Sequence, residues 1–534
     1  MYVFWFFLFF VIITLILYLQ EGLKTMKNIM YHSTRNNEVR LSASKAVLKG
    51  LADDGGLFVP DELPKLDISF EKLSDMDYKG VAYEVMKLFL TDYTEDELKY
   101  CIEHAYDAKF DTEEIAPLTY ADGVYYLELF HGATIAFKDM ALSILPYLMT
   151  TAAKKNDLKE EIVILTATSG DTGKAALAGF ADVPGTRIAV FYPKNGVSPV
   201  QEKQMVTQKG KNVKVIGIKG NFDDAQTGVK KMFNDSALKD ELKEKGFVFS
   251  SANSINIGRL VPQVVYYVYS YTRLLKNGKL SDKDKINFTV PTGNFGNILA
   301  AYYAKQLGVP VGRLICASNS NRVLTDFFMT GRYDRTKEMD LASGNFESER
   351  KFMLTESPSM DILISSNLER LVYLALGSDD GKDAALMKDL NEKGFYELDD
   401  NAKSFLKDFE YGFADEEKTS AKIKALYEDT GYVIDTHTAV ASAVYDDYKK
   451  RSGDETVTVI ASTASPYKFA KSVMSAIDAA NKDREDFALI DDLKEISGTE
   501  LPQAIKDIKE ADVLHDTVCE ISEMPSEVKA FLGV

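Results

Sequence analysis

Short runs of β-branched and apolar residues, each followed by turn residues and then a helical pattern, dominate the centre of this 534-residue chain. The runs are EIVILTA at 161–167, RIAVFYP at 187–193, VKVIGI at 213–218, INFTVP at 286–291 and VTVIAS at 457–462. Strands that alternate with helices build parallel sheets, because each helix returns the chain to the same end of the sheet. The pattern therefore predicts an α/β protein with a doubly wound parallel sheet.

The charge and the cysteines narrow the class of partner and the cellular setting. The chain carries 63 Lys and Arg against 81 Asp and Glu, a formal net charge of −18, which disfavours DNA or an acidic membrane surface as a partner. Cys101, Cys316 and Cys519 are widely spaced and match neither a metal-ligand pattern nor a disulfide framework. We expect no nucleic-acid partner, no metal and a reducing, cytoplasmic setting.

An uncharged apolar run from Met1 to Leu19 is long enough to cross a bilayer. A cleaved secretory signal fits poorly, because the run lacks a basic start and a small-residue cleavage site. Two interpretations stay open: a membrane anchor that tethers a cytoplasmic enzyme domain, or a stretch added by a wrongly chosen start codon, with Met26 or Met30 as the true first residue. We favour the second, since a complete soluble domain can be read from Lys27 onward. Membrane association is expected only if the run is expressed.

The loop after the 286–291 run has the composition of an anion-binding turn. It reads PTGNFGN from Pro291 to Asn297 and leads into a helical pattern. Gly293 and Gly296 let the backbone N–H groups converge, and the helix start adds a positive dipole end, so the loop can cradle a phosphate. A tight turn without a ligand is the alternative.

A second polar loop, SGDTG, follows the 161–167 run and precedes a helix expected to start near Lys174. Ser169, Asp171 and Thr172 bring hydroxyls and free amides to this helix start. Such a cluster can hold a substrate carboxylate. Alternatively, Asp171 and Thr172 act only as helix caps.

Lys138 lies in HGATIAFKDMAL, between apolar residues and at the expected start of a helix that continues through Leu145. Most lysines are solvated and carry no chemistry. An apolar flank changes this, since desolvation lowers the pKa of an ammonium group and frees the amine as a nucleophile. A lysine that forms a Schiff base requires such surroundings.

Eight blocks, spread in order over nearly the whole chain, carry a family resemblance. They are STR at 33–35, GLADDGGLFVP at 50–60, HGATIAFKD at 131–139, SGDTG at 169–173, SANSINIGRL at 251–260, PTGNFGN at 291–297, DTHTAVA at 435–441 and STASPYKF at 462–469. Together they closely resemble threonine synthase, a fold type II enzyme that uses pyridoxal 5'-phosphate (PLP). The resemblance implies a tryptophan synthase β-like fold, with doubly wound parallel sheets in two domains and an extra N-terminal module.

The expected domain limits follow from this match. We expect the apolar segment at 1–25, the N-terminal module at 26–118, a smaller α/β domain with the lysine and the SGDTG loop at 119–270, and a larger α/β domain with the phosphate loop at 271–534.

The resemblance also implies roles for the cofactor residues. Lys138 would hold PLP as a Schiff base and, once freed, move protons between the substrate carbons. Thr463 would face the pyridine nitrogen, where a neutral hydroxyl should leave that nitrogen less protonated than an aspartate would. The residues that would surround the cofactor phosphate are Gly293, Asn294, Phe295, Gly296 and Asn297.

Substrate roles are implied in the same way. Ser169, Asp171 and Thr172 would lie near the substrate carboxylate or the cofactor ring. Asn256 and Arg259 are nominated for the substrate phosphate.

The implied activity is conversion of O-phospho-L-homoserine and water to L-threonine and phosphate, by a monomer or homodimer. One alternative is a related fold type II lyase or dehydratase acting on phosphohomoserine or threonine. Another is a membrane-tethered binding protein that keeps the PLP fold without turnover, and the apolar N-terminal run is its only support.

The chain departs from the pattern of many relatives at two positions. Ala133 replaces a proline, and Ser465 replaces a histidine, which puts a hydrogen bond or local charge near Thr463 in doubt. His131 and His437 belong to matching blocks, but we expect structural roles for both and name neither as a base.

Overall fold

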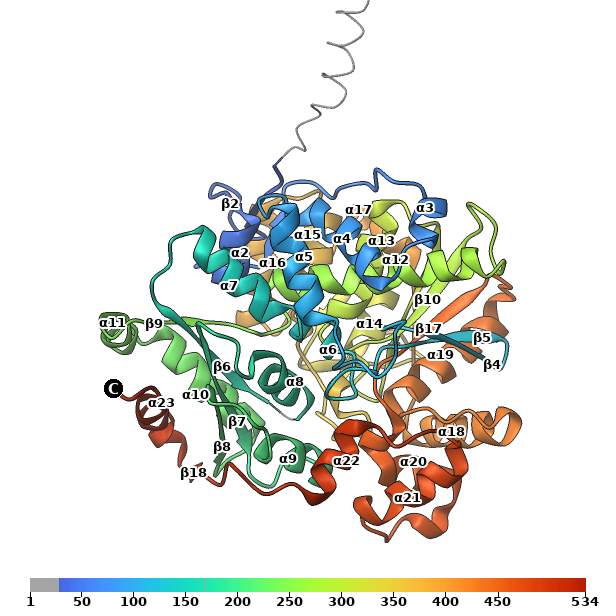
Figure 1. The fold of residues 1–534 in the computed structure, drawn as a ribbon. Helices are drawn as coiled ribbons and strands as arrows, with labels where there is room; N and C mark the ends of the chain where they lie inside the picture. Colours follow the sequence, from blue (N-terminus) through green and yellow to red (C-terminus); the bar gives the residue numbers. More distant parts are fainter. Residues whose placement is uncertain (1–27, 169) are drawn as a thin grey trace, which may run out of the picture.

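The computed structural model describes residues 28–168 and 170–534 (Figure 1). The apolar run Met1–Leu19 and Ser169 lie outside the described residues, so the expectations placed on them stay expectations. Within the described part, the helices are all too short or too polar to cross a bilayer.

A six-stranded sheet forms the larger half of the molecule, with the strand order β16-β11-β10-β17-β5-β4. The strands are β4 (Leu118–Ala121), β5 (Val124–Glu128), β10 (Ile286–Pro291), β11 (Val311–Ser318), β16 (Phe409–Phe413) and β17 (Thr458–Ser462). All neighbours pair in parallel except β4, which pairs with β5 in antiparallel. Val459 and Ala461 enter one core cluster, whereas Ile460 between them enters another. Both faces of the sheet are therefore covered, as expected for a doubly wound sheet.

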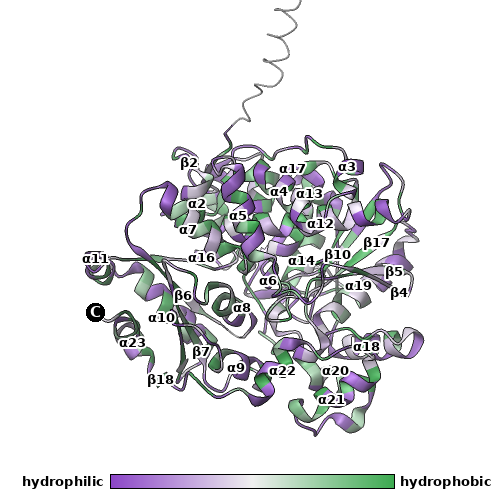
Figure 2. Ribbon diagram, viewed as in Figure 1, coloured by the Kyte–Doolittle hydropathy of each residue, from purple (hydrophilic) through white to green (hydrophobic). Residues whose placement is uncertain are grey.

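A five-stranded parallel sheet forms the smaller half, with the order β18-β8-β7-β6-β9. Its strands are β6 (Glu161–Ala167), β7 (Thr186–Pro193), β8 (Val213–Ile218), β9 (Phe247–Ser250) and β18 (Val518–Cys519). Figure 2 shows apolar strands beneath helices that are polar on one side and apolar on the other. The predicted strands at 161–167, 213–218 and 286–291 are confirmed to the residue, and those at 187–193 and 457–462 to within one residue.

The N-terminal module consists of a small antiparallel sheet and helices that pack on the larger half. The sheet contains β1 (Met30–Ser33), β2 (Leu41–Ser42) and β3 (Phe58–Pro60). The helices are α2 (Ala43–Lys49), α3 (Phe70–Ser74), α4 (Tyr78–Phe89) and α5 (Glu95–Ala105). Both α3 and α4 pack on α12 (Ile257–Lys276), which is buried along most of its length.

Further helices cover the two large sheets. They are α6 (Asp139–Leu142), α7 (Leu145–Lys155), α8 (Asp171–Phe180), α9 (Pro199–Val206), α10 (Phe222–Asn234), α11 (Ser236–Glu244), α13 (Gly296–Leu307), α14 (Val323–Thr330), α15 (Leu368–Ala375), α16 (Asp380–Glu392), α17 (Asp400–Phe405), α18 (Glu416–Thr430), α19 (Thr436–Ser452), α20 (Ala470–Ile477), α21 (Asp486–Ser497), α22 (Gln503–Glu510) and α23 (Met524–Leu532). Two short 3-10 turns, η1 (Pro358–Met360) and η3 (Pro466–Phe469), matter for the site.

The sheets cross the expected domain limits at 119–270 and 271–534. The strand β5 pairs with β17 in the larger sheet, and β18 pairs with β8 in the smaller sheet. Figure 1 shows β18 and α23, in red, beside the green strands of the smaller sheet. We therefore propose domain limits that follow the sheets, with β4 and β5 in the larger domain and β18 and α23 in the smaller one.

Candidate active site

The carboxyl ends of β6, β10 and β17 open onto one large cleft. Its lining includes Lys138, the loop 291–297, Thr463 and His437. Ligands of open parallel sheets bind at this edge, because loops and helix starts converge there. The sequence-predicted loops and the predicted lysine are thus brought together in one place.

Lys138 is held at the start of α6 by a tight turn. Ile135 has a left-handed backbone with φ of 52°. The Asp139 carboxylate accepts from the Thr134 backbone N–H at 2.8 Å and from its hydroxyl at 2.6 Å. The helix is shorter than expected, since α6 ends at Leu142 and α7 begins only at Leu145. This turn fixes the backbone that carries Lys138.

The Lys138 segment is also tied to the end of β17. The Phe137 N–H donates to the Thr463 carbonyl at 2.8 Å, and Ala136 forms a β-bridge with Ala464. Thr463 itself is buried and lines the cleft. The lysine and the threonine therefore face the same cleft from two joined segments.

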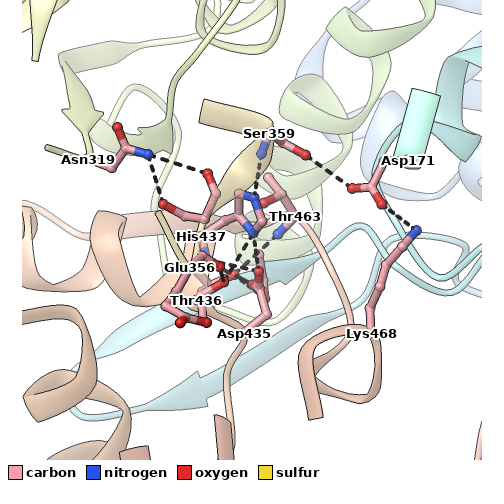
Figure 3. A network of polar contacts seen from close by, with 12 residues as sticks. Asp171, Asn319, Glu356, Ser359, Asp435, Thr436, His437, Thr463 and Lys468 are labelled. Carbon is pink, nitrogen blue, oxygen red and sulfur yellow. Dashed lines mark hydrogen bonds and ion pairs between the residues drawn. The ribbon is translucent and has the colours of Figure 1, made fainter. Parts of the chain in front are cut away.

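Asp171 pairs with two buried lysines, of which Figure 3 labels Lys468. Its Oδ1 atom lies 2.8 Å from Lys468 Nζ, and its Oδ2 atom lies 3.3 Å from Lys138 Nζ. The Ser359 hydroxyl donates to Oδ2 at 3.1 Å and accepts from Lys138 Nζ at 3.1 Å. Gln201 Nε2 donates to Oδ1 at 2.9 Å. Both carboxylate oxygens of Asp171 therefore have charged and polar partners: Lys468 and Gln201 at Oδ1, and Lys138 and Ser359 at Oδ2.

Burial and neighbouring charges shift the pKa of both Lys138 and Asp171. Burial lowers the pKa of Lys138, Asp171 opposes this effect, and Lys468 adds to it. Burial alone would raise the pKa of Asp171, but Lys468 and Lys138 hold it well below its usual range. An anionic Asp171 repels a second carboxylate, so its side chain is unsuited to contact the substrate carboxylate directly.

The SGDTG loop is ordered by a residue outside the predicted set. The Thr168 hydroxyl accepts from the Gly170 and Gly173 N–H groups, each at 2.9 Å. The helix α8 begins at Asp171 rather than near Lys174, and its N-cap residue is Gly170. The reading of Asp171 and Thr172 as mere caps is therefore wrong, and Thr172 lines the cleft.

The loop 293–297 fits a phosphate group. Phe295 has a left-handed backbone with φ of 64° and starts α13 without a side-chain cap. The Asn297 Oδ1 atom accepts from the hydroxyls of Tyr266 at 2.5 Å and Tyr267 at 2.6 Å. Among the described residues, the buried Asn297 Nδ2 has no hydrogen-bond partner. A free donor and an uncapped helix start are what the phosphate of PLP would require.

Close packing makes Gly293 necessary in this loop. A Cβ atom on Gly293 would lie 2.7 Å from the Ser359 carbonyl oxygen and 3.2 Å from Met360 Cα. The backbone of η1 therefore rests directly on the loop. This contact links the phosphate cradle to the Ser359 hydroxyl that meets Lys138.

Arg259 and Asn256, the two residues nominated for the substrate phosphate, differ in their position relative to the cleft and in their hydrogen bonds. Arg259 lines the cleft, and its Nη1 donates to the Ala252 carbonyl at 2.9 Å, while its buried Nε has no partner in the described chain. Burial lowers the pKa of Arg259 to about 10. Asn256 is the N-cap of α12: its amide accepts from Gly258 N–H and donates to two backbone carbonyls. Asn256 is also absent from the cleft lining, so of these two residues Arg259 is the one with a free donor among the described contacts.

The histidines have distinct surroundings. His131 lies between Asp111 at 2.6 Å and Glu128 at 2.9 Å, away from the cleft lining. Burial alone would lower the pKa of His131, but these hydrogen bonds raise it to about 9. His437 lines the cleft, with Nδ1 2.7 Å from Asp435 Oδ2 and Nε2 accepting from the Ser359 N–H at 3.2 Å (Figure 3).

Sequence reasoning missed Ser359, Gln201 and Lys468. Ser359 and Gln201 lie outside the matching blocks and carry no motif of their own. Lys468 lies inside STASPYKF, and its apolar neighbours were the available signal that it is buried. Ser465 caps η3, since its hydroxyl accepts from the Tyr467 N–H at 3.4 Å.

A buried lysine beside a phosphate-fitting loop, at the edge of parallel sheets, defines a PLP-dependent enzyme. Accordingly, the family model described as "Pyridoxal-phosphate dependent enzyme" matches residues 112–393, and PLP is the cofactor of this class. Two further models match on either side: "Threonine synthase N terminus" at 30–106 and "Threonine synthase, C-terminal" at 438–518. The chain belongs to the threonine synthase family.

Similar proteins agree with this assignment. "Threonine synthase" of Schizosaccharomyces pombe is 37% identical over 473 residues, covering 84% of this chain and 90% of that protein. The solved structure of PLP-bound threonine synthase from Brucella melitensis has a TM-score of 0.81 at 33% identity, covering 94% of this chain and 99% of that one. "Threonine synthase-like 1" of Macaca fascicularis is 40% identical over 447 residues, covering 81% of this chain. The chain spans only 58% of the length of that relative.

Proposed function

We propose that the protein is a threonine synthase that converts O-phospho-L-homoserine and water to L-threonine and phosphate, with PLP as cofactor. The proposal rests chiefly on one observation: the buried Lys138 amine and the loop 293–297 line the same cleft. The family membership and the coverage of the yeast relative support the choice of reaction.

The residues that would hold PLP are those with free or suitably placed donors. Lys138 would bond to the cofactor, the loop from Gly293 to Asn297 would hold its phosphate, and Thr463 would face its ring nitrogen. When bound, PLP supplies an electron sink that stabilises negative charge on neighbouring carbon atoms. Lys138 Nζ, lowered in pKa by burial, can then take up and release protons in the cleft.

We assign the substrate phosphate and the substrate carboxylate to different residues. Arg259, whose buried Nε has no hydrogen-bond partner among the described residues, is proposed to bind the substrate phosphate. Thr172 and Ser169 are proposed for the substrate carboxylate, whereas Asp171 pairs with Lys138 and Lys468. Asn256 is proposed to support Arg259 from behind, through the N-terminus of α12. A cytoplasmic setting and a monomeric or homodimeric state complete the proposal.

The decisive experiment is incubation of a protein that starts at Met26 with PLP and phosphohomoserine. Threonine and phosphate are assayed together, along with 2-oxobutyrate. We expect equal amounts of threonine and phosphate. Phosphate with 2-oxobutyrate and no threonine would replace the synthase with a lyase, and the absence of any product would leave only a binding protein.

A further inference from the structure

We infer that Lys468 is a positioning residue that neutralises Asp171 and thereby keeps the amine of Lys138 in its uncharged, reactive form. The inference builds on the proposed role of Lys138 as the cofactor lysine. It concerns a residue to which neither the sequence blocks nor the family assignment gives a role.

The geometry favours Lys468 as the main partner of Asp171. Lys468 Nζ lies 2.8 Å from Asp171 Oδ1, whereas Lys138 Nζ lies 3.3 Å from Oδ2. The Lys468 side chain is fully buried, and its Nζ also donates to the Thr134 carbonyl at 3.0 Å. Lys468 is therefore held by two fixed acceptors, while Lys138 faces the cleft with a longer contact.

The net charge of the buried cluster of Asp171, Lys468 and Lys138 depends on the protonation of Lys138. Asp171 carries one negative charge, and Lys468 supplies one positive charge. A charged Lys138 would leave the buried cluster with a net positive charge, which is costly in a low-dielectric site. Asp171 can therefore anchor the Lys138 amine through Ser359 and a long contact without forcing it to remain an ammonium.

Other charged groups near Lys138 do not reverse this balance. Arg259, on α12, further disfavours a charged Lys138, and burial acts in the same direction. The carboxylate of Asp139, the residue after Lys138, accepts hydrogen bonds from the backbone N–H and the hydroxyl of Thr134. His437, on α19, accepts the Ser359 N–H at Nε2 and pairs with Asp435 through Nδ1. Among the described residues, Lys468 and Lys138 are the cations that form ion pairs with Asp171.

The position of Lys468 follows from its local structure. It lies in η3, between the cap residue Ser465 and the start of α20. The Ser465 N–H donates to the Ile135 carbonyl at 3.1 Å, and the Phe137 N–H donates to the Thr463 carbonyl. Two backbone hydrogen bonds thus join the segment that leads into Lys468 to the segment that leads into Lys138, so the backbone places the two amines relative to each other.

The test compares the proton affinity of Lys138 with and without Lys468. The full-length protein, stripped of cofactor, is trace-labelled with acetic anhydride between pH 6 and 11, and the labelling of Lys138 is followed by mass spectrometry. We expect Lys468→Met to raise the pKa of Lys138 by about one unit or more, which reduces the labelling rate at pH 8 by about tenfold. Lys468→Arg, which keeps the charge, should restore most of the wild-type profile.

A double variant separates this electrostatic role from a structural one. Lys468→Met combined with Asp171→Asn removes both charges, so the pKa of Lys138 should fall back to the wild-type value or below. The matched control is Lys422→Met. Lys422 is a largely buried lysine that pairs with Asp122 and Asp446 at 2.8 Å each, outside the cleft lining, and its loss should leave the Lys138 profile unchanged.

An unchanged Lys138 profile in a folded Lys468→Met protein would overturn the inference, and so would an equal change in the Lys422→Met control. If Lys468→Met does not fold, Lys468→Gln replaces it, since the amide can still donate to the Thr134 carbonyl. The labelling uses no substrate. A shifted profile in a protein that makes no threonine would therefore sustain this inference while the proposed function fails.

Discussion

The Phe137 N–H donates to the Thr463 carbonyl at 2.8 Å, so the segment that carries the proposed cofactor lysine is bonded to the residue proposed to face the cofactor ring. These residues are more than three hundred positions apart in the sequence. A backbone bond fixes the separation of two groups more firmly than side-chain contacts do, because it leaves no rotamer free. The site is therefore preorganised around the lysine.

Replacing Lys138 with alanine should abolish the covalent cofactor linkage. The amine is the proposed bonding group and the proposed proton carrier, and loss of a positioned acid–base group costs about 10²–10⁴-fold in rate. Reduction with borohydride followed by mass spectrometry would find no PLP attached to residue 138. The control is Lys174→Ala, since Lys174 is a nearby lysine that bonds to Gln208 and does not line the cleft. A reducible linkage and full turnover in Lys138→Ala would end the proposal.

A methyl group at Gly293 should weaken cofactor binding. Its Cβ would meet the Ser359 carbonyl oxygen at 2.7 Å, which pushes η1 away from Lys138. Overpacking of this kind costs roughly 1–3 kcal/mol, so we expect Gly293→Ala to raise the Kd of PLP by about tenfold or more. Fluorescence titration with PLP measures this.

The matched control for that variant is Gly381→Ala, in the first turn of α16. There a Cβ would meet only Asp379 Oδ1, at an ordinary 3.5 Å. This variant should bind PLP as the wild type does, and a similar loss of affinity would show that the clash at Gly293 is not the cause.

Substitution of Asn256 should lower stability, whereas substitution of Arg259 should weaken substrate binding. Asn256→Ala removes a buried cap and should lower the free energy of unfolding by about 2 kcal/mol, measured by urea unfolding. The exposed cap variant Asp379→Ala should lose only about 1 kcal/mol. Arg259→Met should instead raise KM for phosphohomoserine, because it removes the free donor. An unchanged KM would remove Arg259 from the substrate site.

His131 should make stability depend on pH. Its pKa in the folded protein, about 9, is above its usual value, which is about 6.5 in an unfolded chain. The stabilisation is therefore fully present below about pH 6.5 and is lost as the pH rises through 9. Urea unfolding of the wild type and His131→Gln should show a difference at pH 6 that shrinks by pH 9.5. A difference independent of pH would contradict this assignment.

Local patterns predicted much of the fold. The run EIVILTA is β-branched and bounded by turn residues, and it forms β6 with those limits. The family, the enzyme class and the cofactor predicted from the ordered blocks are confirmed by the matching family models. Such features are written locally, so they can be read without tertiary structure.

Features that depend on tertiary pairing were not predicted. Nothing near Val518 indicates that it pairs with Gly217, because a two-residue strand carries no period. Ser359, which forms hydrogen bonds with Lys138 and Asp171, lies in the turn η1. Contacts with Gly293 and His437 set the position of this turn. The ion pair between Asp171 and Lys468 likewise forms only when folding brings these distant residues together.

The pairing of β18 with β8 has a consequence for synthesis on the ribosome. The smaller sheet gains its outer strand only from Val518–Cys519, and α23 packs beside it, so most of the polypeptide must be translated before that edge is covered. Until then β8 presents an open hydrogen-bonding edge, the kind of surface that chaperones shield and that promotes aggregation. Removal of residues 511–534 should therefore reduce the yield of native protein even though the cleft-lining lysine and phosphate loop are left intact.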